Sequence, residues 1–298
     1  MKNLILLIAL SIGFFSCEQK DCCYEPEQPQ LIFKLKFDPT QERLDGLGNV
    51  ALLPDTHGAQ SPNFNTMSAH YIELTSNNFT MPGQGVQIFK GSTTASHGQV
   101  TVGGNNLDPI DFSKAIVKEE GEIFYSIPLK DVANGTYPYV RVSVTYQNFD
   151  ITYKAQGFNG LTGTVASFVG YGQHLDNVIL KNKSIAVNDT KPQGFWAVED
   201  HITGTIIDGQ APIGATTVPN PLAGTSAIAE GSCLVTGVFD TPFTITGNET
   251  NDITIDLSFS INNSFEWIDV DKDNIYEPEA GDQVIDMGLR GLKPIVSK

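Results

Sequence analysis

The chain has 298 residues and carries 34 acidic against 18 basic side chains, which gives a net charge of −16. A surface this acidic repels phosphate groups, so the composition excludes nucleic acid and anionic lipid as partners. Apart from Cys17, the cysteines are Cys22, Cys23 and Cys233, a sparse and odd number that builds no disulfide framework.

The first residues carry an export pattern. Lys2 is followed by an apolar run from Leu4 to Phe15, and a small residue stands directly before Cys17. The run is shorter than the roughly 20 apolar residues that a membrane-spanning helix needs. The layout resembles a bacterial lipoprotein signal peptide, in which the cysteine is lipidated and becomes the first mature residue. The resemblance implies a signal peptide over residues 1–16, although Phe14 stands where leucine is usual; the alternative is an ordinary secretory signal cleaved elsewhere.

Residues 17–30 are polar and contain proline without apolar periodicity, which predicts a flexible tether that holds a domain off a membrane. Acidic residues soon after Cys17 resemble the surface-export signal of Bacteroidota lipoproteins. Together the two resemblances imply a protein that is anchored by lipid to the outer membrane, at the periplasmic side or at the cell surface.

Residues 31–298 predict an all-β ectodomain, an antiparallel β-sandwich with long loop insertions. Apolar residues alternate with mostly polar ones, as half-buried strands require. The expected strands are Leu31–Phe37, His70–Leu74, Gly85–Phe89, Val140–Tyr146, Phe149–Tyr153 and, as the strongest, Ile253–Ile261.

Several irregular features are also expected. The phase of alternation changes near Gln147 or Asn148, which predicts a bulge or tight turn there. Short helices fit residues 111–118 and 129–132. Residues 203–232 are rich in small and polar residues and predict a long surface segment with one hairpin at residues 204–213. A division into two smaller β-domains would fall near residues 156–163.

An acidic segment near the C-terminus holds six carboxylates within fourteen residues, and such crowding is best tolerated around a hard cation. Alternating Asp269, Asp271 and Asp273 match the first, third and fifth ligand positions of an EF-hand calcium loop. Asn274 occupies the sixth position, where a residue that tolerates positive φ is needed. Ile275 would offer its carbonyl at the seventh position.

The EF-hand pattern then fails, because the twelfth position is Ala280 and not a bidentate glutamate. Glu277 falls at the ninth position, and Glu279 or Asp282 would have to supply the closing ligand. Both flanks, at residues 265–267 and 284–287, continue as strands. The segment therefore resembles the calcium-binding Asp-x-Asp-x-Asp loops between β-strands of secreted proteins, and it predicts a structural calcium site; the alternative is a solvated acidic hairpin.

A further resemblance covers residues 30–150. A strand that ends in Phe37-Asp38 is followed by Met67-Ser-Ala-His-Tyr-Ile-Glu-Leu and then by a strand that contains Gly135-Thr-Tyr. This order is similar to the periplasmic copper-binding β-sandwich family associated with methanobactin operons. The resemblance implies metal or small-ligand binding and transfers no ligand residue. The histidines available for a transition metal are His57, His70, His97, His174 and His201, the last near Trp196.

We favour a non-enzymatic, lipid-anchored envelope protein that binds a glycan, a protein or a metal-bearing ligand, or assists an outer-membrane complex. One alternative is a copper or other transition-metal binder that uses the histidines. The other is a calcium-assisted glycan or phosphoester hydrolase, for which two carboxylates, for example Glu73 and Asp256, would have to meet in one cleft. No catalytic residue is assigned.

Overall fold

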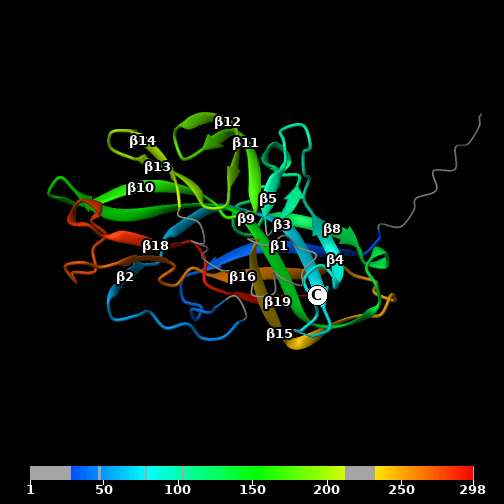
Figure 1. The fold of residues 1–298 in the computed structure, drawn as a ribbon. Coiled ribbons are helices and arrows are strands. Elements are labelled where there is room, and N and C mark those ends of the chain that lie inside the picture. The colour runs from blue at the N-terminus through cyan, green and yellow to red at the C-terminus, as the bar shows by residue number, and fades with distance from the viewer. Residues whose placement is uncertain (1–27, 46–47, 78, 103, 212–231, 298) are drawn as a thin grey trace, which may run out of the picture.

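The computed structural model in Figure 1 describes residues 28–45, 48–77, 79–102, 104–211 and 232–297. They form an all-β, sandwich-like fold, which confirms the predicted fold class. Most of the described strand pairs are antiparallel. The parallel pairs are β1 (Gln30–Asp38) with β16 (Ile253–Ser260), β15 (Cys233–Ile245) with β19 (Leu292–Ser297), and β11 (Gly172–Ile179) with β7 (Ile110–Asp111). The predicted signal peptide, tether and Cys17 lie almost wholly outside these residues.

The largest sheet contains eleven strands around the long strand β9. Nine of them follow one another in the order β14 (Ile206–Gln210), β13 (Phe195–Asp200), β10 (Phe158–Phe168), β9 (Gly135–Ala155), β15 (Cys233–Ile245), β19 (Leu292–Ser297), β16 (Ile253–Ser260), β1 (Gln30–Asp38) and β8 (Ile123–Pro128). Strand β3 (Asn63–Thr75) also pairs with β9 and carries β4 (Val86–Lys90) at its outer edge.

Three smaller sheets complete the described fold. They are β12 (Ser184–Pro192) with β11 (Gly172–Ile179) and β7 (Ile110–Asp111); β18 (Gln283–Met287) with β17 (Phe265–Ile268) and β2 (His57–Gln60); and β5 (Val100–Val102) with β6 (Asn105–Leu107). The short 3-10 helices are η1 (Phe112–Lys114), η2 (Leu129–Asp131) and η4 (Pro278–Ala280). The first two confirm the short helices expected at residues 111–118 and 129–132. No described helix has the length and apolar character that crossing a membrane requires.

Strands β1 and β16 show why the alternation in the sequence was informative. Leu31, Phe33 and Leu35 on β1 are buried, and the residues between them are half-buried. β16 runs parallel to β1 and aligns Ile255 with Phe33 and Leu257 with Leu35, so the apolar faces of both strands enter one core. Period-two alternation specifies this register because a shift by one residue would turn every apolar side chain to the opposite face.

Strand β9 departs from the expectation of a half-buried strand, because every residue from Val140 to Phe149 is buried. The irregularity expected near Gln147 or Asn148 is present, because the pairing of β9 with β3 shifts register between Asn148 and Phe149. A second shift lies on the other side of Gln147, where the pairing skips Thr145. At this point β9 also exchanges its other neighbour: Val144 pairs with β15, and Tyr146 pairs with β10. The phase change in the sequence therefore marks an exchange of partner strands.

Two hydrophobic cores form on the two sides of this sheet. The main core includes Phe33, Val142 and Phe149, and strands β4 and β8 meet across it, since the ring of Phe89 lies 5.3 Å from that of Phe124. The second core packs Tyr146, Phe168 and their neighbours against the β11–β12 sheet. Together the cores explain why both faces of β9 are buried.

The connecting segment at residues 204–213 differs from what the sequence suggested. The strand at residues 206–210 does not form a hairpin within residues 204–213; it pairs back with β13 as β14. The rest of the expected long segment, residues 212–231, lies outside the described residues. Residues 156–163 form the β9–β10 turn and the first half of β10.

A buried ion pair fastens β3 to β9. Arg141 donates to Glu73 Oε1 at 3.2 Å, and both side chains are almost completely buried. The second oxygen of Glu73 accepts hydrogen bonds from the backbone amides of Gly83 and Gly85. Loss of the arginine would therefore leave a buried carboxylate without its countercharge.

We expect Arg141→Ala to lower the free energy of unfolding by about 3–5 kcal/mol, because it leaves a buried charge unpaired. The matched control is Lys36→Ala, which removes a pair with Asp38 at 3.3 Å where the lysine side chain is 41% exposed. That change should cost less than about 1 kcal/mol. Urea unfolding of both variants measures the difference, and equal losses would contradict the importance of the buried pair.

Candidate metal centre

The acidic segment forms the loop between β17 and β18, two antiparallel strands, as the flanks of the sequence predicted. Trp267 on β17 is fully buried and lies against β2. A Cβ atom at Gly58 would come within 2.4 Å of the Trp267 ring, so only glycine permits this approach. Tyr276 within the loop packs its ring on Phe265 at 5.2 Å and anchors the loop to the same core.

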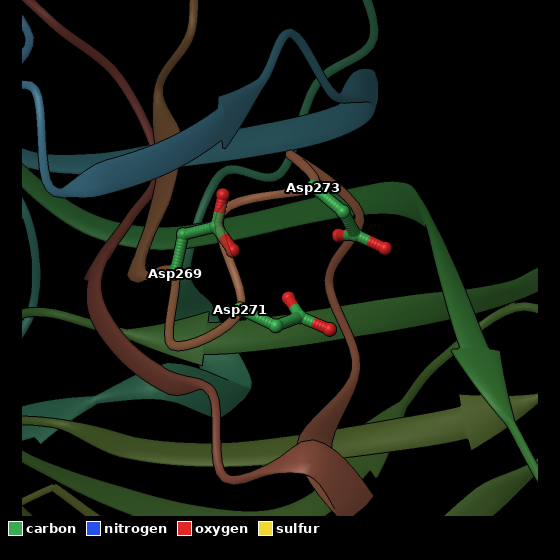
Figure 2. Close-up of side chains that lie close together, drawn as sticks. All are labelled: Asp269, Asp271 and Asp273. Atoms are coloured by element: carbon green, nitrogen blue, oxygen red, sulfur yellow. The ribbon is translucent and has the colours of Figure 1, made fainter.

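Asp269, Asp271 and Asp273 come together on this loop (Figure 2). One carboxylate oxygen from each lies within 4.8 Å of the others. Within the described part of the chain, this is the one group of three or more histidine, cysteine or acidic residues with ligand atoms this close. Asp269 is buried, whereas Asp271 and Asp273 are exposed, so a cation would reach the site from solvent.

Backbone amides hold the loop around Asp269. The carboxylate of Asp269 accepts hydrogen bonds from Lys272 N at 2.9 Å and Asn274 N at 2.8 Å. Lys272 and Asn274 both adopt positive φ, at 63° and 57°, which confirms the expectation for Asn274. Asn274 Oδ1 also accepts from Ala59 N at 3.1 Å and ties the loop to β2. The loop thus has a defined conformation built on its own amides.

The other predicted ligands have different partners. Glu277 forms an ion pair with Lys154 at 2.5 Å, and Glu279 accepts from Gln156 N at 2.7 Å, so both contact the end of β9. Asp282 accepts from Val270 N at 3.0 Å and Glu277 N at 2.8 Å and thereby closes the base of the loop. Ile275 N donates to Asp273 Oδ1. The structure groups the first three aspartates and leaves the remaining acids as supports of the loop.

Electrostatic repulsion is evident within the triplet. Partial loss of hydration, and then the neighbouring carboxylates of Asp273 and Asp269, raise the pKa of Asp271 above its ordinary value. A hard divalent cation relieves such repulsion, and oxygen-only ligands of this kind suit calcium or magnesium rather than a soft metal. The arrangement is therefore chemically suited to a hard cation, with solvent or a carbonyl completing its coordination.

A buried cluster of charges lies behind the loop and was not expected from the sequence. Glu266 on β17 pairs with His57 at 2.5 Å, with Arg290 at 2.6 Å and with Arg43. Asp286 on β18 stands directly opposite Glu266 and pairs with Arg290. The two arginines balance the negative charges of the two acids. The sequence does not predict this cluster, because its residues come from distant segments of the chain and no local pattern links them.

Glu266 and Asp286 are both buried, but their pKa values shift in opposite directions. Burial by itself would raise the pKa of Glu266, but hydrogen bonds from His57 and Arg43 outweigh it and hold that pKa below its ordinary value. Burial raises the pKa of Asp286 to about 7, because the attraction of Arg290 is insufficient and the charge of Glu266 adds repulsion. Asp286 is therefore a proton-binding group within the folded protein.

The histidines are dispersed, with one exception. The rings of His97 and His174 stack in parallel with their centroids 3.4 Å apart, and His174 also contacts Thr190. His70 is buried beside Tyr171, and His201 bonds to Thr164. His57 belongs to the cluster around Glu266. His97 and His174 are thus two histidines that meet, as the copper alternative allows, and among the described residues they belong to no group of three or more possible metal ligands.

The two carboxylates considered for hydrolysis have unrelated surroundings. Glu73 lies on β3 and is buried against Arg141 of β9. Asp256 lies on β16 and aligns with Lys34 of β1. Neither carboxylate lines the cleft that β9, β10, β13 and β14 form with β17 and β18. Comparison with protein-family models, curated proteins and solved structures finds no match for this chain.

The raised pKa of Asp286 predicts a pH dependence of stability. An unfolded carboxyl titrates near its ordinary value of 3.8, whereas the folded one titrates at about 7, so between these values the folded state holds an extra proton. Stability therefore falls as pH rises from about 4 to about 7 on account of this group. Asp286→Asn cannot ionise at position 286, so its free energy of unfolding should not fall with pH on account of this group. Relative to the wild type, the free energy of unfolding of the variant should therefore increase by more than about 1 kcal/mol between pH 4 and pH 7.

Urea unfolding at several pH values measures this difference. Asp240→Asn, which changes an exposed aspartate on β15, is the control and should follow the wild type at every pH. A constant difference between Asp286→Asn and the wild type would contradict the assignment.

Proposed function

We propose that this protein is a lipid-anchored binding protein of the cell envelope, in which calcium closes the loop between β17 and β18 as a structural element. The binding role covers a glycan, a protein or a small ligand at the outer membrane or cell surface. Lipid at Cys17 would supply the membrane attachment.

The observation that carries the calcium part is the meeting of Asp269, Asp271 and Asp273 on a loop whose amides already hold Asp269 in place. A preformed loop reduces the entropy that calcium binding must overcome. The flanking strands pack Trp267 and Phe265 into the main core, so closing the loop would stabilise the neighbouring sheet. This placement supports a structural role more than a catalytic one.

The lipid anchor rests on the pattern of residues 1–17, in which Lys2, the apolar run and Cys17 have the layout of a lipoprotein signal. An acidic all-β ectodomain that is held on a tether favours a binding role outside the membrane over a role within it. The stacked pair of His97 and His174 is the observation that supports the copper alternative.

Calcium should raise the melting temperature of the full chain carrying Cys17→Ser, which cannot be lipidated. At about 100 times the dissociation constant, binding adds about 2.7 kcal/mol, or roughly 5 °C for a chain of this size. Asp271→Asn should lose most of the shift, because it removes one of three grouped carboxylates. Asp240→Asn, an exposed aspartate outside the loop, should keep it.

Metal analysis of the purified protein completes this test. Calcium is expected, and copper in its place would favour the transition-metal alternative. An unchanged melting temperature in calcium, with Asp271→Asn also without effect, would end the calcium proposal.

Cys17→Ser should abolish labelling by a radioactive fatty acid in bacterial cells and leave a precursor that keeps residues 1–16, because cleavage of a lipoprotein signal follows lipidation of the cysteine. The physical reason is that the thiol of Cys17 is the acceptor of the acyl-bearing group and serine offers none. Cys22→Ser is the matched control and should retain both the label and the cleavage. A serine variant at Cys17 that stays labelled would contradict the anchor.

A further inference from the structure

The main core opens at one end into a cleft of about 790 Å³. Figure 1 shows β10, β13 and β14 at that end of the molecule together with β18 and β2. One wall of the cleft comes from β9, β10, β13 and β14, and the other from β17, β18 and the acidic loop. The volume lies within the range of about 300–1,000 Å³ that small-molecule sites occupy.

The walls are mainly apolar because the cleft continues the main core. Val165 and Phe265 line it and belong to that core, and Val198 and Val284 pack against it. Ile207 on the outermost strand β14 is 58% exposed although it lines the cleft. These apolar side chains surround a space that no described residue fills. An apolar molecule bound in this space would leave water, as a core side chain does.

Trp196 provides a flat aromatic surface in the wall. Its ring lies close over β14, since a Cβ atom at Gly209 would come within 2.5 Å of the Trp196 ring. Indole rings bind flat apolar or aromatic molecules through large contact areas. Glycine at position 209 therefore permits the orientation of Trp196 that leaves the cleft open.

The polar groups of the cleft define the charge of a ligand. Its ionisable acids are Asp200, Asp282 and Asp286, and among the described lining residues none is a lysine, arginine or histidine. Hydrogen bonds from Thr203, and then from Tyr153, lower the pKa of Asp200 to about 2, so it is ionised at neutral pH. Asp286 is paired with Arg290, whereas the ionised Asp200 has no cationic partner among the described lining residues, so an anionic ligand would meet a carboxylate of like charge there.

We propose that this cleft binds an apolar, ring-containing small molecule that is uncharged or cationic. The carboxylate of Asp200 already accepts hydrogen bonds from Tyr153, from the backbone N and Oγ1 of Thr203 and from the backbone of Ile202, so it acts on a ligand through its negative charge. The proposal names a ligand class for the binding role proposed above. It does not depend on calcium, since dye binding and calcium-dependent melting are separate measurements.

The test uses two dyes that share one ring system. Phenylnaphthylamine is uncharged and carries one N–H donor, and anilinonaphthalene sulfonate adds an anionic sulfonate to the same rings. The full chain with Cys17→Ser should bind the uncharged dye with a saturable rise in fluorescence at one site. It should bind the sulfonate at least about 10-fold more weakly, which corresponds to about 1.4 kcal/mol of repulsion.

Two variants locate the site by a matched comparison. Ile207→Asp places a charge in the apolar wall and should weaken binding of the uncharged dye by more than about 10-fold. Ile179→Asp is the control, because Ile179 on β11 is also a strand isoleucine, is 68% exposed and lies outside the lining of the cleft. It should bind the dye like the parent chain, and circular dichroism should show both variants folded.

A third variant tests the charge. Asp200→Asn removes the negative charge, so it should strengthen binding of the sulfonate relative to binding of the uncharged dye and narrow the difference between the two dissociation constants. Absence of saturable binding by the uncharged dye would overturn the proposal. Equal effects of Ile207→Asp and Ile179→Asp would overturn the location, and equal affinity for both dyes in the parent chain would overturn the charge preference.

Discussion

Burial of strand β9 on both faces is the constraint on which the rest of the structure depends. The strand pairs with β3 along one edge, and along the other it exchanges β15 for β10 at Thr145. This exchange divides the structure into an end closed by β4 and β8 and an end where β10, β13 and β14 face the β17–β18 hairpin. A strand with two covered faces must neutralise its polar side chains internally, which is why Arg141 requires Glu73.

The acidic loop belongs to the second end, and its function follows from that position. Its amides orient Asp269, its Asn274 holds β2, and Glu277 and Glu279 reach the end of β9. Tyr276 and Asp282 of the same loop line the cleft. A cation bound by the triplet would therefore act where one wall of the cleft is built. The proposed metal site and the proposed ligand site therefore share a structural element, although each is tested by a separate measurement.

Much of this architecture was predictable where a local pattern carries the information. The alternation of β1 and β16 specified strands and buried faces, and the apolar flanks of the acidic loop predicted β17 and β18 in place of EF-hand helices. The grouping of Asp269, Asp271 and Asp273 follows from their spacing on one tight loop. Glu277 and Glu279 were assigned to the same group because sequence spacing does not show that Lys154 and Gln156 lie beside them.

The sequence by itself determined the all-β class, the buried face of its best strands and the loop that gathers three aspartates, because each depends on neighbours a few residues apart. Only the tertiary structure decided that the polar face of β9 is buried and that Glu266 lies among His57, Arg43 and Arg290. It alone assembled the cleft, whose walls come from segments more than a hundred residues apart, such as Ile151 and Val284. Contacts of this kind depend on how sheets stack, and no local periodicity encodes that.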